Sequence, residues 1–306
     1  MKIIGIHDSD DTSFPNLALM KLSAFHKQKG DQVEFFLPIM SSLYDKIYSS
    51  KVFSWTRSQE YLPKITIKGG TGYNIFNNLP DKIEHICPDY DLYNIKYSMG
   101  FLTRGCIRKC SWCIVPEKEG SIIAHADIKE FARHKDIVLM DNNVLSISHG
   151  IKQIEKIIKL GLRIDFNQGL DPRLIDSITA KLLSKVKWLS PIRLSCDTSA
   201  QIPIIQKAVT LLRWYNTKPT NFFVYVLVKD VPDALERIKF LKGLGLEPFA
   251  QPYRDQKNTK PTIQQRRFSR WVNHKAIFKT VQWENYGCFK KRKNLIKELR
   301  CFKVSK

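Results

Sequence analysis

Three cysteines fall within eight residues of one another in the stretch GCIRKCSWC, which spans residues 105–113. Cys106, Cys110 and Cys113 follow the spacing C-x3-C-x2-C, which can place three thiolates on one tight loop. Three thiolates can take three corners of an iron–sulfur cluster and leave one iron without a protein ligand. A metal with an open position can bind a substrate or cofactor directly. Residues expected to support the site are Gly105, which relieves backbone crowding, and the cations Arg104, Arg108 and Lys109, which offset the thiolate charge.

The other cysteines are Cys87, Cys196, Cys288 and Cys301, and the total of seven does not suit a set of disulfides in a secreted protein. The alternative for the triplet is a structural zinc site, which usually takes four protein ligands from paired C-x2-C units. The chain has one such pair, so Cys87 or Cys196 would have to supply a fourth ligand. The remaining cysteines are expected to be small apolar residues.

The elements that must position the triplet alternate regularly after residue 93. Six apolar runs predict strands, and helices are expected near 127–134, 148–160, 172–186, 199–214 and 231–243. The runs are KYSMGFLT, DIVLMDNN, LRIDFNQG, IRLSCDTS, NFFVYVLV and LEPFAQPY. Successive strands begin roughly 25 to 40 residues apart, which predicts parallel βα units with right-handed crossovers. Six such units make about three quarters of a TIM-type barrel, and the cysteines come just after the first strand, where functional groups gather.

The residues before this alternation predict a small α/β domain. KIIGI, QVEFFLP and ITIKGGTGY have the composition of strands, and residues 16–29 carry apolar side chains at helical spacing before Gly30. The chain is therefore expected to contain a Rossmann-like domain over 1–95, a partial (β/α)6 barrel over 96–255 and a basic helical extension over 256–306.

The chain carries a net charge of +21, of which +13 lies within residues 251–306. Such a basic segment can bind phosphate groups of nucleic acid, but it is more typical of a solvated amphipathic helix, since no nucleic-acid-binding motif accompanies the charge. No apolar run is long enough to span a bilayer, and the first residues become acidic before an export signal can form. We expect a cytoplasmic protein that does not engage a membrane.

The triplet, Trp112 next to its last cysteine, and the six βα units behind it resemble the radical S-adenosylmethionine superfamily. The resemblance implies a [4Fe–4S] cluster whose free iron chelates the amino and carboxylate groups of S-adenosylmethionine. One electron from a flavodoxin-type or ferredoxin-type donor then splits the sulfonium into methionine and a 5′-deoxyadenosyl radical. That radical abstracts a hydrogen from a substrate, and the protein positions the cofactor and excludes water and oxygen.

The resemblance also implies roles for polar residues at the strand ends. Asp141, Asn142 and Asn143 stand where the family holds the methionine amine, and Gln168 closes the next strand. The alternative for residues 141–143 is a helix cap or a turn. Trp112 is expected either to bind the cofactor or to pack over the loop.

On the fourth strand, Arg193 is suited to the methionine carboxylate, and Ser195 or Asp197 to the ribose hydroxyls. Alternation places these three on one face, so they can also form a polar layer without a ligand. Gln251 and Tyr253, at the sixth strand, are expected near the adenine or the substrate.

An α/β domain ahead of the barrel resembles the corrinoid-binding domain of cobalamin-dependent radical enzymes. The signature Asp-x-His-x-x-Gly is missing, because residues 7–11 read His-Asp-Ser-Asp-Asp. Gly69, Gly70 and Gly72 can cradle a phosphate or form a plain turn. Cobalamin is therefore an option that the sequence does not favour.

The predicted function is that of a radical S-adenosylmethionine enzyme with an unidentified substrate, which nucleic acid would suit as well as a small metabolite. The alternative is a non-catalytic iron–sulfur or zinc protein whose basic tail binds nucleic acid.

Overall fold

A computed structural model describes residues 1–57, 59–255 and 259–286, which form two compact units. The first unit comprises Met1–Ile192 and Leu211–Thr220, and the second comprises Arg193–Thr210 and Asn221–Lys306. These bounds differ from the domain boundaries expected near residues 95 and 255, and the three-domain division remains a prediction.

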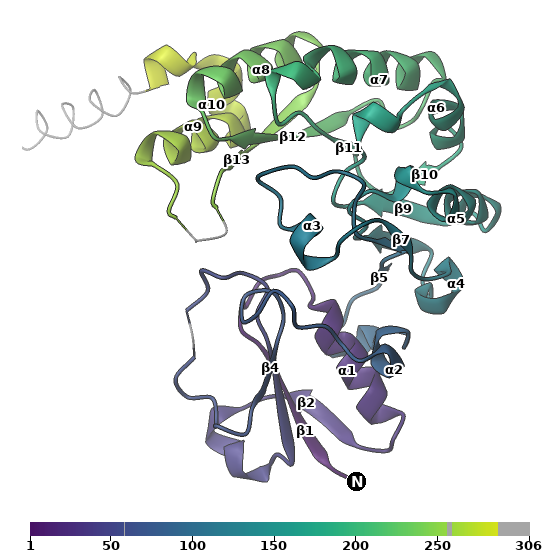
Figure 1. The fold of residues 1–306 in the computed structure, drawn as a ribbon, viewed down its shortest axis with the longest axis vertical. Coiled ribbons are helices and arrows are strands. Elements are labelled where there is room, and N and C mark those ends of the chain that lie inside the picture. The colour runs from purple at the N-terminus through teal and green to yellow at the C-terminus, as the bar shows by residue number, and fades with distance from the viewer. Residues whose placement is uncertain (58, 256–258, 287–306) are drawn as a thin grey trace, which may run out of the picture. The chain divides into compact units, whose positions relative to one another are not determined.

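The N-terminal sheet of the first unit is parallel, with strand order β2-β1-β3-β4 (Figure 1). Helix α1 (Leu17–Lys27) begins at Asn16, whose side chain accepts a hydrogen bond from the Leu19 amide, and it covers one face of the sheet. Leu19 of α1 packs against Ile4 and Ile6 in the core. The strands are β1 (Ile3–Asp8), β2 (Gln32–Phe35), β3 (Lys46–Ser50) and β4 (Ile67–Gly69).

Strand β3 lies inside this sheet, yet apolar patterning does not predict it. Its sequence KIYSS buries Ile47 fully, but the buried residues that follow are Ser49 and Ser50. Hydroxyl groups are tolerated in this interior because they are hydrogen-bonded to neighbouring side chains.

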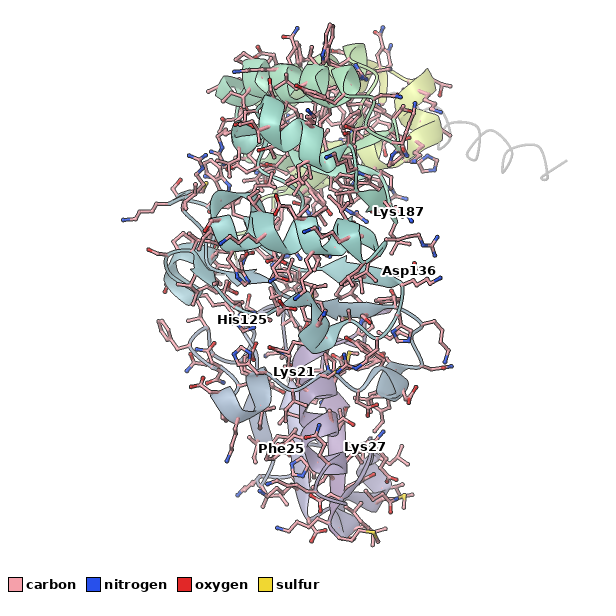
Figure 2. All side chains as sticks on the ribbon, turned by 90° about the vertical axis from the view of Figure 1, so that its right-hand side faces the viewer. Lys21, Phe25, Lys27, His125, Asp136 and Lys187 are labelled. Carbon is pink, nitrogen blue, oxygen red and sulfur yellow. The ribbon has the colours of Figure 1, made fainter. Side chains whose placement is uncertain are left out.

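A second parallel sheet of the first unit has the order β10-β9-β8-β5. Its strands are β5 (Ser98–Gly100), β8 (Asp136–Leu139), β9 (Arg163–Phe166) and β10 (Lys187–Trp188). Asp136 and Lys187 mark the amino ends of β8 and β10 (Figure 2). The helices that follow its strands are α4 (Ile128–Phe131), α5 (Ser148–Lys159) and α6 (Ser177–Leu183). Met20 of α1 shares a core with Met99 of β5 and Val138 of β8, which joins this sheet to the N-terminal layer.

The second unit holds a parallel β12–β13 pair next to β11, in the order β11-β12-β13. Its strands are β11 (Ile192–Ser195), β12 (Phe222–Val228) and β13 (Glu247–Pro252), and its helices are α7 (Ile202–Trp214), α8 (Val231–Gly243), α9 (Ile263–Asn273) and α10 (Lys275–Thr280). The unit boundary passes through β11, after Ile192, and through α7, before Leu211. Short helical turns elsewhere in the chain are η1 (Pro38–Leu43), α2 (Asp81–Glu84), η2 (Tyr90–Tyr93), α3 (Val115–Lys118), η3 (Val144–Ser146), η4 (Pro172–Leu174) and η5 (Ser199–Gln201).

The prediction of an α/β protein with parallel sheets is confirmed, and all six expected strands and five expected helices of the second part of the chain are present. A closed barrel is not seen: within the described ranges the six strands belong to two separate sheets. The short strand β10 is not predicted by the sequence, since its two residues carry no periodicity, and it pairs with β9 directly.

The basic extension is described as far as residue 286, where it contains α9 and α10. The rest of it, with Cys288, Cys301 and the most basic stretch, lies outside the described residues. None of the helices that the structure describes is long and apolar enough to cross a membrane.

Candidate functional site

The three clustered cysteines lie on a loop of residues 105–122, here called the cysteine loop. An antiparallel pair closes its base, β6 (Thr103–Arg104) with β7 (Ile123–Ala124). Gly105 opens the loop with φ of +79°, and a Cβ there would lie 2.3 Å from the Ser121 carbonyl oxygen. Only glycine fits both constraints, so the crowding that Gly105 relieves comes from the returning loop itself.

Cys106, Cys110 and Cys113 are half-buried, and none of them is in a disulfide. The Cys106 sulfur accepts hydrogen bonds from the Arg108 amide at 3.3 Å and from Asn143 Nδ2 at 3.4 Å. Hydrogen bonds to a cysteine sulfur tune an iron–sulfur cluster that the sulfur holds. The three cysteine sulfurs are therefore chemically suitable ligands for an iron–sulfur cluster.

Glu119 fastens the base of the cysteine loop. Its carboxylate accepts hydrogen bonds from the Gly105 amide at 2.9 Å and from Asn142 Nδ2 at 3.0 Å, and it pairs with Arg104 at 3.0 Å. Asn142 therefore uses its amide group to hold the loop. In the sequence Glu119 is one of two glutamates on either side of Lys118, and only the structure distinguishes its role.

Asp141 is buried at the end of β8 and anchors the chain just before the loop. Its carboxylate accepts hydrogen bonds from the amides of Leu102 and Thr103 and from the Thr103 hydroxyl, the last two at 2.6 Å. Burial raises the pKa of Asp141 to about 6, although these hydrogen bonds oppose the shift. The observed contacts of Asp141 are structural, and its predicted role toward the methionine amine remains a prediction.

Asn143 faces Cys106 with one half of its amide group and leaves the other half unpaired. Its side chain is 3% exposed, and Nδ2 donates to the Cys106 sulfur and to Asp171. The Asn143 Oδ1 atom is buried and has no hydrogen-bond partner. The other buried orphan atoms among the described residues are hydroxyl oxygens, on Thr66, Thr217 and Ser269. A donor group of a ligand beside Cys106 would satisfy this oxygen.

Arg108, inside the cysteine loop, donates from Nε to Asp171 at 3.0 Å. Asp171 belongs to the segment after β9, where sequence reasoning identifies only the neighbouring Gln168. The Arg108 side chain therefore forms an ion pair with a protein carboxylate, and Arg104 forms one with Glu119.

A cavity of about 1130 Å³ adjoins these strand ends within the first unit. It is lined by Lys21 and Phe25 of α1 (Figure 2), by the glycine turn after β4, and by Met140 and Gln168 at the carboxyl ends of β8 and β9. At Gly69 a Cβ would meet no atom within 4 Å, so the cavity reaches the backbone there. Its volume exceeds that of most pockets for drug-sized ligands.

His7 does not line this cavity. Its ring is hydrogen-bonded with the Ser49 hydroxyl through Nδ1 and with the Tyr61 hydroxyl through Nε2, both at 3.0 Å. Burial lowers the pKa of His7, so it is neutral near pH 7.

In the second unit, β11 alternates as predicted. Ile192, Leu194 and Cys196 are fully buried, whereas Arg193, Ser195 and Asp197 are half-buried. The Arg193 guanidinium lies 5.5 Å from the ring centre of Phe223 and donates to the Tyr225 hydroxyl at 3.4 Å, and Asp197 accepts from the Leu227 amide at 3.2 Å. These side chains share one face of their own sheet, and their roles toward S-adenosylmethionine remain predictions.

For the remaining predicted residues, the structure gives their exposure or their contacts with neighbouring side chains. Gln251 is exposed on β13, the Tyr253 ring lies 4.6 Å from Lys229 Nζ, and Trp112 is half-buried in the cysteine loop. Cys196 is an unsuitable metal ligand, because burial raises the pKa of its thiol to about 12. Cys87 packs against the core around Tyr90 and Met99.

In the part of the chain that the structure describes, no three His, Cys, Asp or Glu side chains gather closely enough to hold one metal ion. A single zinc ion holds its sulfur ligands at about 2.3 Å each. The thiolates of an iron–sulfur cube ligate different irons and therefore lie farther apart.

Comparisons with known proteins show the fold. No protein-family model and no curated protein matches the chain. A similar solved structure is that of the cobalamin-dependent S-adenosylmethionine radical enzyme OxsB with aqua-cobalamin and S-adenosylmethionine bound, at a TM-score of 0.53 and 12% identity. The match covers 91% of this chain and 56% of that chain, so this chain spans little more than half the length of that enzyme. The chain therefore has a radical-S-adenosylmethionine-like fold.

Proposed function

We propose that this chain is a radical S-adenosylmethionine enzyme in which Cys106, Cys110 and Cys113 hold a [4Fe–4S] cluster. One observation carries the proposal. Three cysteines outside any disulfide lie on one loop, and the buried side-chain oxygen of Asn143, whose amide nitrogen donates to Cys106, has no hydrogen-bond partner. The similarity of fold to a radical S-adenosylmethionine enzyme supports it. When bound, the cluster supplies the electron that cleaves S-adenosylmethionine into methionine and a hydrogen-abstracting 5′-deoxyadenosyl radical.

Residues around the cysteine loop would prepare this chemistry. Asn143 Oδ1 would accept a hydrogen bond from the methionine ammonium, since it is buried, unpaired and next to Cys106. Asp141 and Glu119 anchor the two sides of the loop base and would help to hold the three sulfurs in position.

The similarity of fold also supports a proposal for the architecture. The six strands β5, β8, β9, β11, β12 and β13 would be those of a partial (β/α)6 barrel, with residues 1–95 as a separate Rossmann-like domain. A flavodoxin-type or ferredoxin-type protein would deliver the electron in the cytoplasm.

We further propose cobalamin as a second cofactor, in the cavity next to the carboxyl ends of β8 and β9. OxsB was solved with aqua-cobalamin bound, and the cavity here is large and reaches the backbone at Gly69. Since His7 is held by Ser49 and Tyr61 and does not line the cavity, the corrinoid would bind without His7 as a ligand.

The cluster is tested by reconstituting the protein with iron and sulfide without oxygen, reducing it with dithionite, and measuring 5′-deoxyadenosine formed from S-adenosylmethionine. The wild type should form it, and Cys110→Ala should not. Equal yields from both proteins would refute the proposal.

Cobalamin binding is tested separately by gel filtration of the protein with aqua-cobalamin and absorbance of the protein peak. Gly69→Leu should place a branched side chain in the part of the cavity beside β4 and weaken retention. Gly243→Leu is the matched control, because its Cβ also meets no atom within 4 Å but lies on α8. Absence of retention by the wild type, or equal retention by all three proteins, would refute the cobalamin site and leave the cluster proposal intact.

A further inference from the structure

Asp171 joins three segments around the cysteine loop. Its side chain is 5% exposed, and Oδ2 accepts hydrogen bonds from Arg108 Nε at 3.0 Å and Asn143 Nδ2 at 3.4 Å. Its Oδ1 accepts from Arg173 Nε at 2.6 Å and from the Arg173 amide at 3.1 Å. One buried carboxylate thereby connects the cysteine loop, the end of β8 and the segment after β9.

Two of these donors act directly on Cys106. Asn143 uses the same Nδ2 for Asp171 and for the Cys106 sulfur, and Arg108 gives its backbone amide to that sulfur while its side chain reaches Asp171. A change at Asp171 would therefore move both groups that donate to Cys106. Groups that orient metal ligands in this indirect way commonly control how tightly the metal is held.

The charged side chains around Asp171 also lie near the cysteines of the loop. Burial alone would raise the pKa of Asp171, but Arg173 and Arg108 hold it below its usual value, so the carboxylate is ionised. Burial would lower the pKa of Arg173, but Asp171 and, to a smaller extent, the nearby Cys110 and Cys106 raise it above its usual value. Two guanidinium groups thus share one carboxylate, and the remaining positive charge lies near the sulfurs.

We propose that Asp171 is a positioning residue for the iron–sulfur cluster: through Arg108 and Asn143 it sets the place of Cys106, and with Arg108 and Arg173 it sets the charge that the cluster meets. The inference rests on the proposed function and extends it to a residue outside the cysteine motif. An added electron makes the cluster more negative, so removing a nearby negative charge favours reduction and removing a positive charge disfavours it.

The test compares wild type, Asp171→Asn, Arg108→Gln and Asp136→Asn after anaerobic reconstitution. Asp136 is the matched control, because it accepts two hydrogen bonds of 2.6 Å from Arg163 at the amino end of β8 (Figure 2). The readouts are the midpoint potential of the cluster, followed by electron paramagnetic resonance, and the rate at which a chelator removes iron.

Asp171→Asn should shift the midpoint potential to a more positive value, and Arg108→Gln should shift it to a more negative one. Both should lose iron roughly 10-fold faster than the wild type, and Asp136→Asn should match the wild type in both readouts. If Asp171→Asn fails to fold, Arg173→Gln is measured instead. It removes a positive charge, so its midpoint potential should be more negative than that of the wild type, as for Arg108→Gln, and a positive shift would overturn the inference. Shifts of the same sign for Asp171→Asn and Arg108→Gln would show general damage and overturn the inference.

A wild-type potential in the aspartate and arginine variants, with wild-type iron loss, would also overturn it. The proposed function fails independently of these results if the wild type forms no 5′-deoxyadenosine. If the wild type forms 5′-deoxyadenosine and Asp171→Asn has the wild-type midpoint potential and rate of iron loss, only the role of Asp171 is refuted.

Discussion

Two polar networks of the first unit differ in what they leave unpaired. Around His7, the hydroxyls of Ser9, Ser49, Tyr61 and Tyr73 are hydrogen-bonded with one another or with the imidazole at 2.9 to 3.2 Å, and none of these groups lacks a partner. Around Cys106, the network contains a thiol outside any disulfide, ionised groups and one orphan amide oxygen.

The difference separates a polar network that completes a fold from one that has capacity for a ligand. Neutral groups that satisfy one another rigidify a core and need nothing further. A buried amide oxygen without a partner carries a desolvation cost that a ligand can remove. His7, which has a residue type suited to catalysis or metal binding, belongs to the first kind, and Asn143 belongs to the second.

The largest expected effect concerns Asp141, which is satisfied internally although it lies next to the site. Asp141→Ala would leave three donors of Leu102 and Thr103 without their acceptor, so the free energy of unfolding should fall by about 4 kcal/mol. Urea unfolding measures the loss, and Asp141→Asn, which keeps an acceptor oxygen, should lose less. A loss below about 1 kcal/mol for the alanine variant would place Asp141 with the ligand-binding groups.

The pH dependence of stability gives the next effect. The pKa of Asp141 is raised to about 6 by burial, above its ordinary value of 3.8, so between these values the folded state binds more protons than the unfolded state. The free energy of unfolding should therefore fall as pH rises from about 4 to about 6, by an amount on the order of 2 kcal/mol from this group. Asp141→Asn should lack this component, and identical slopes for the two proteins would contradict the assignment.

Asn143→Leu tests the orphan oxygen itself. The variant removes an unsatisfied buried atom together with two long hydrogen bonds, so the stability of the metal-free protein should change by less than about 1 kcal/mol. Affinity of the reconstituted protein for S-adenosylmethionine should fall about 10-fold, as expected for one hydrogen bond to a charged group. Equilibrium dialysis measures the affinity, and an unchanged dissociation constant would remove Asn143 from the site.

A smaller effect is expected in the network around His7. Tyr73→Phe removes a hydroxyl that is hydrogen-bonded with Ser9 at 3.1 Å and Ser49 at 2.9 Å, which should cost about 1 kcal/mol of stability. Iron content after reconstitution should stay at the wild-type value. A variant that unfolds normally but loses iron would link the two networks and end the contrast between them.

The smallest effect is expected at the exposed ion pair of Lys275 and Glu247, whose side chains are 74% and 48% exposed. Lys275→Ala should change the melting temperature little, since such pairs contribute from about 0 to 1 kcal/mol. A large change would show that surface charge matters more to this basic chain than its buried networks do.

Local sequence pattern predicts the parts of the structure that depend on neighbours along the chain. The spacing of Cys106, Cys110 and Cys113 and the apolar runs of the six strands identify the loop and the sheets behind it. Local pattern does not predict strand β3. Its buried residues Ser49 and Ser50 are polar, and their hydroxyls are hydrogen-bonded to residues elsewhere in the chain.

Long-range contacts account for the features of the site that the sequence does not reveal. Glu119 and Asp171 bond to groups that lie 14 and 63 residues away, and nothing in their immediate sequence marks them. Asp141 is recognisable as a polar strand-end residue, but its contacts with Leu102 and Thr103 come from chain folding over 39 and 38 residues.

The most direct test of the central claim is the electron paramagnetic resonance spectrum of the reduced, reconstituted protein before and after addition of S-adenosylmethionine. A cluster held by Cys106, Cys110 and Cys113 with one open iron should change its spectrum when the ligand is added. A spectrum that stays the same in a protein that carries its full complement of iron and sulfide would show that the ligand does not reach the cluster, and would contradict the account.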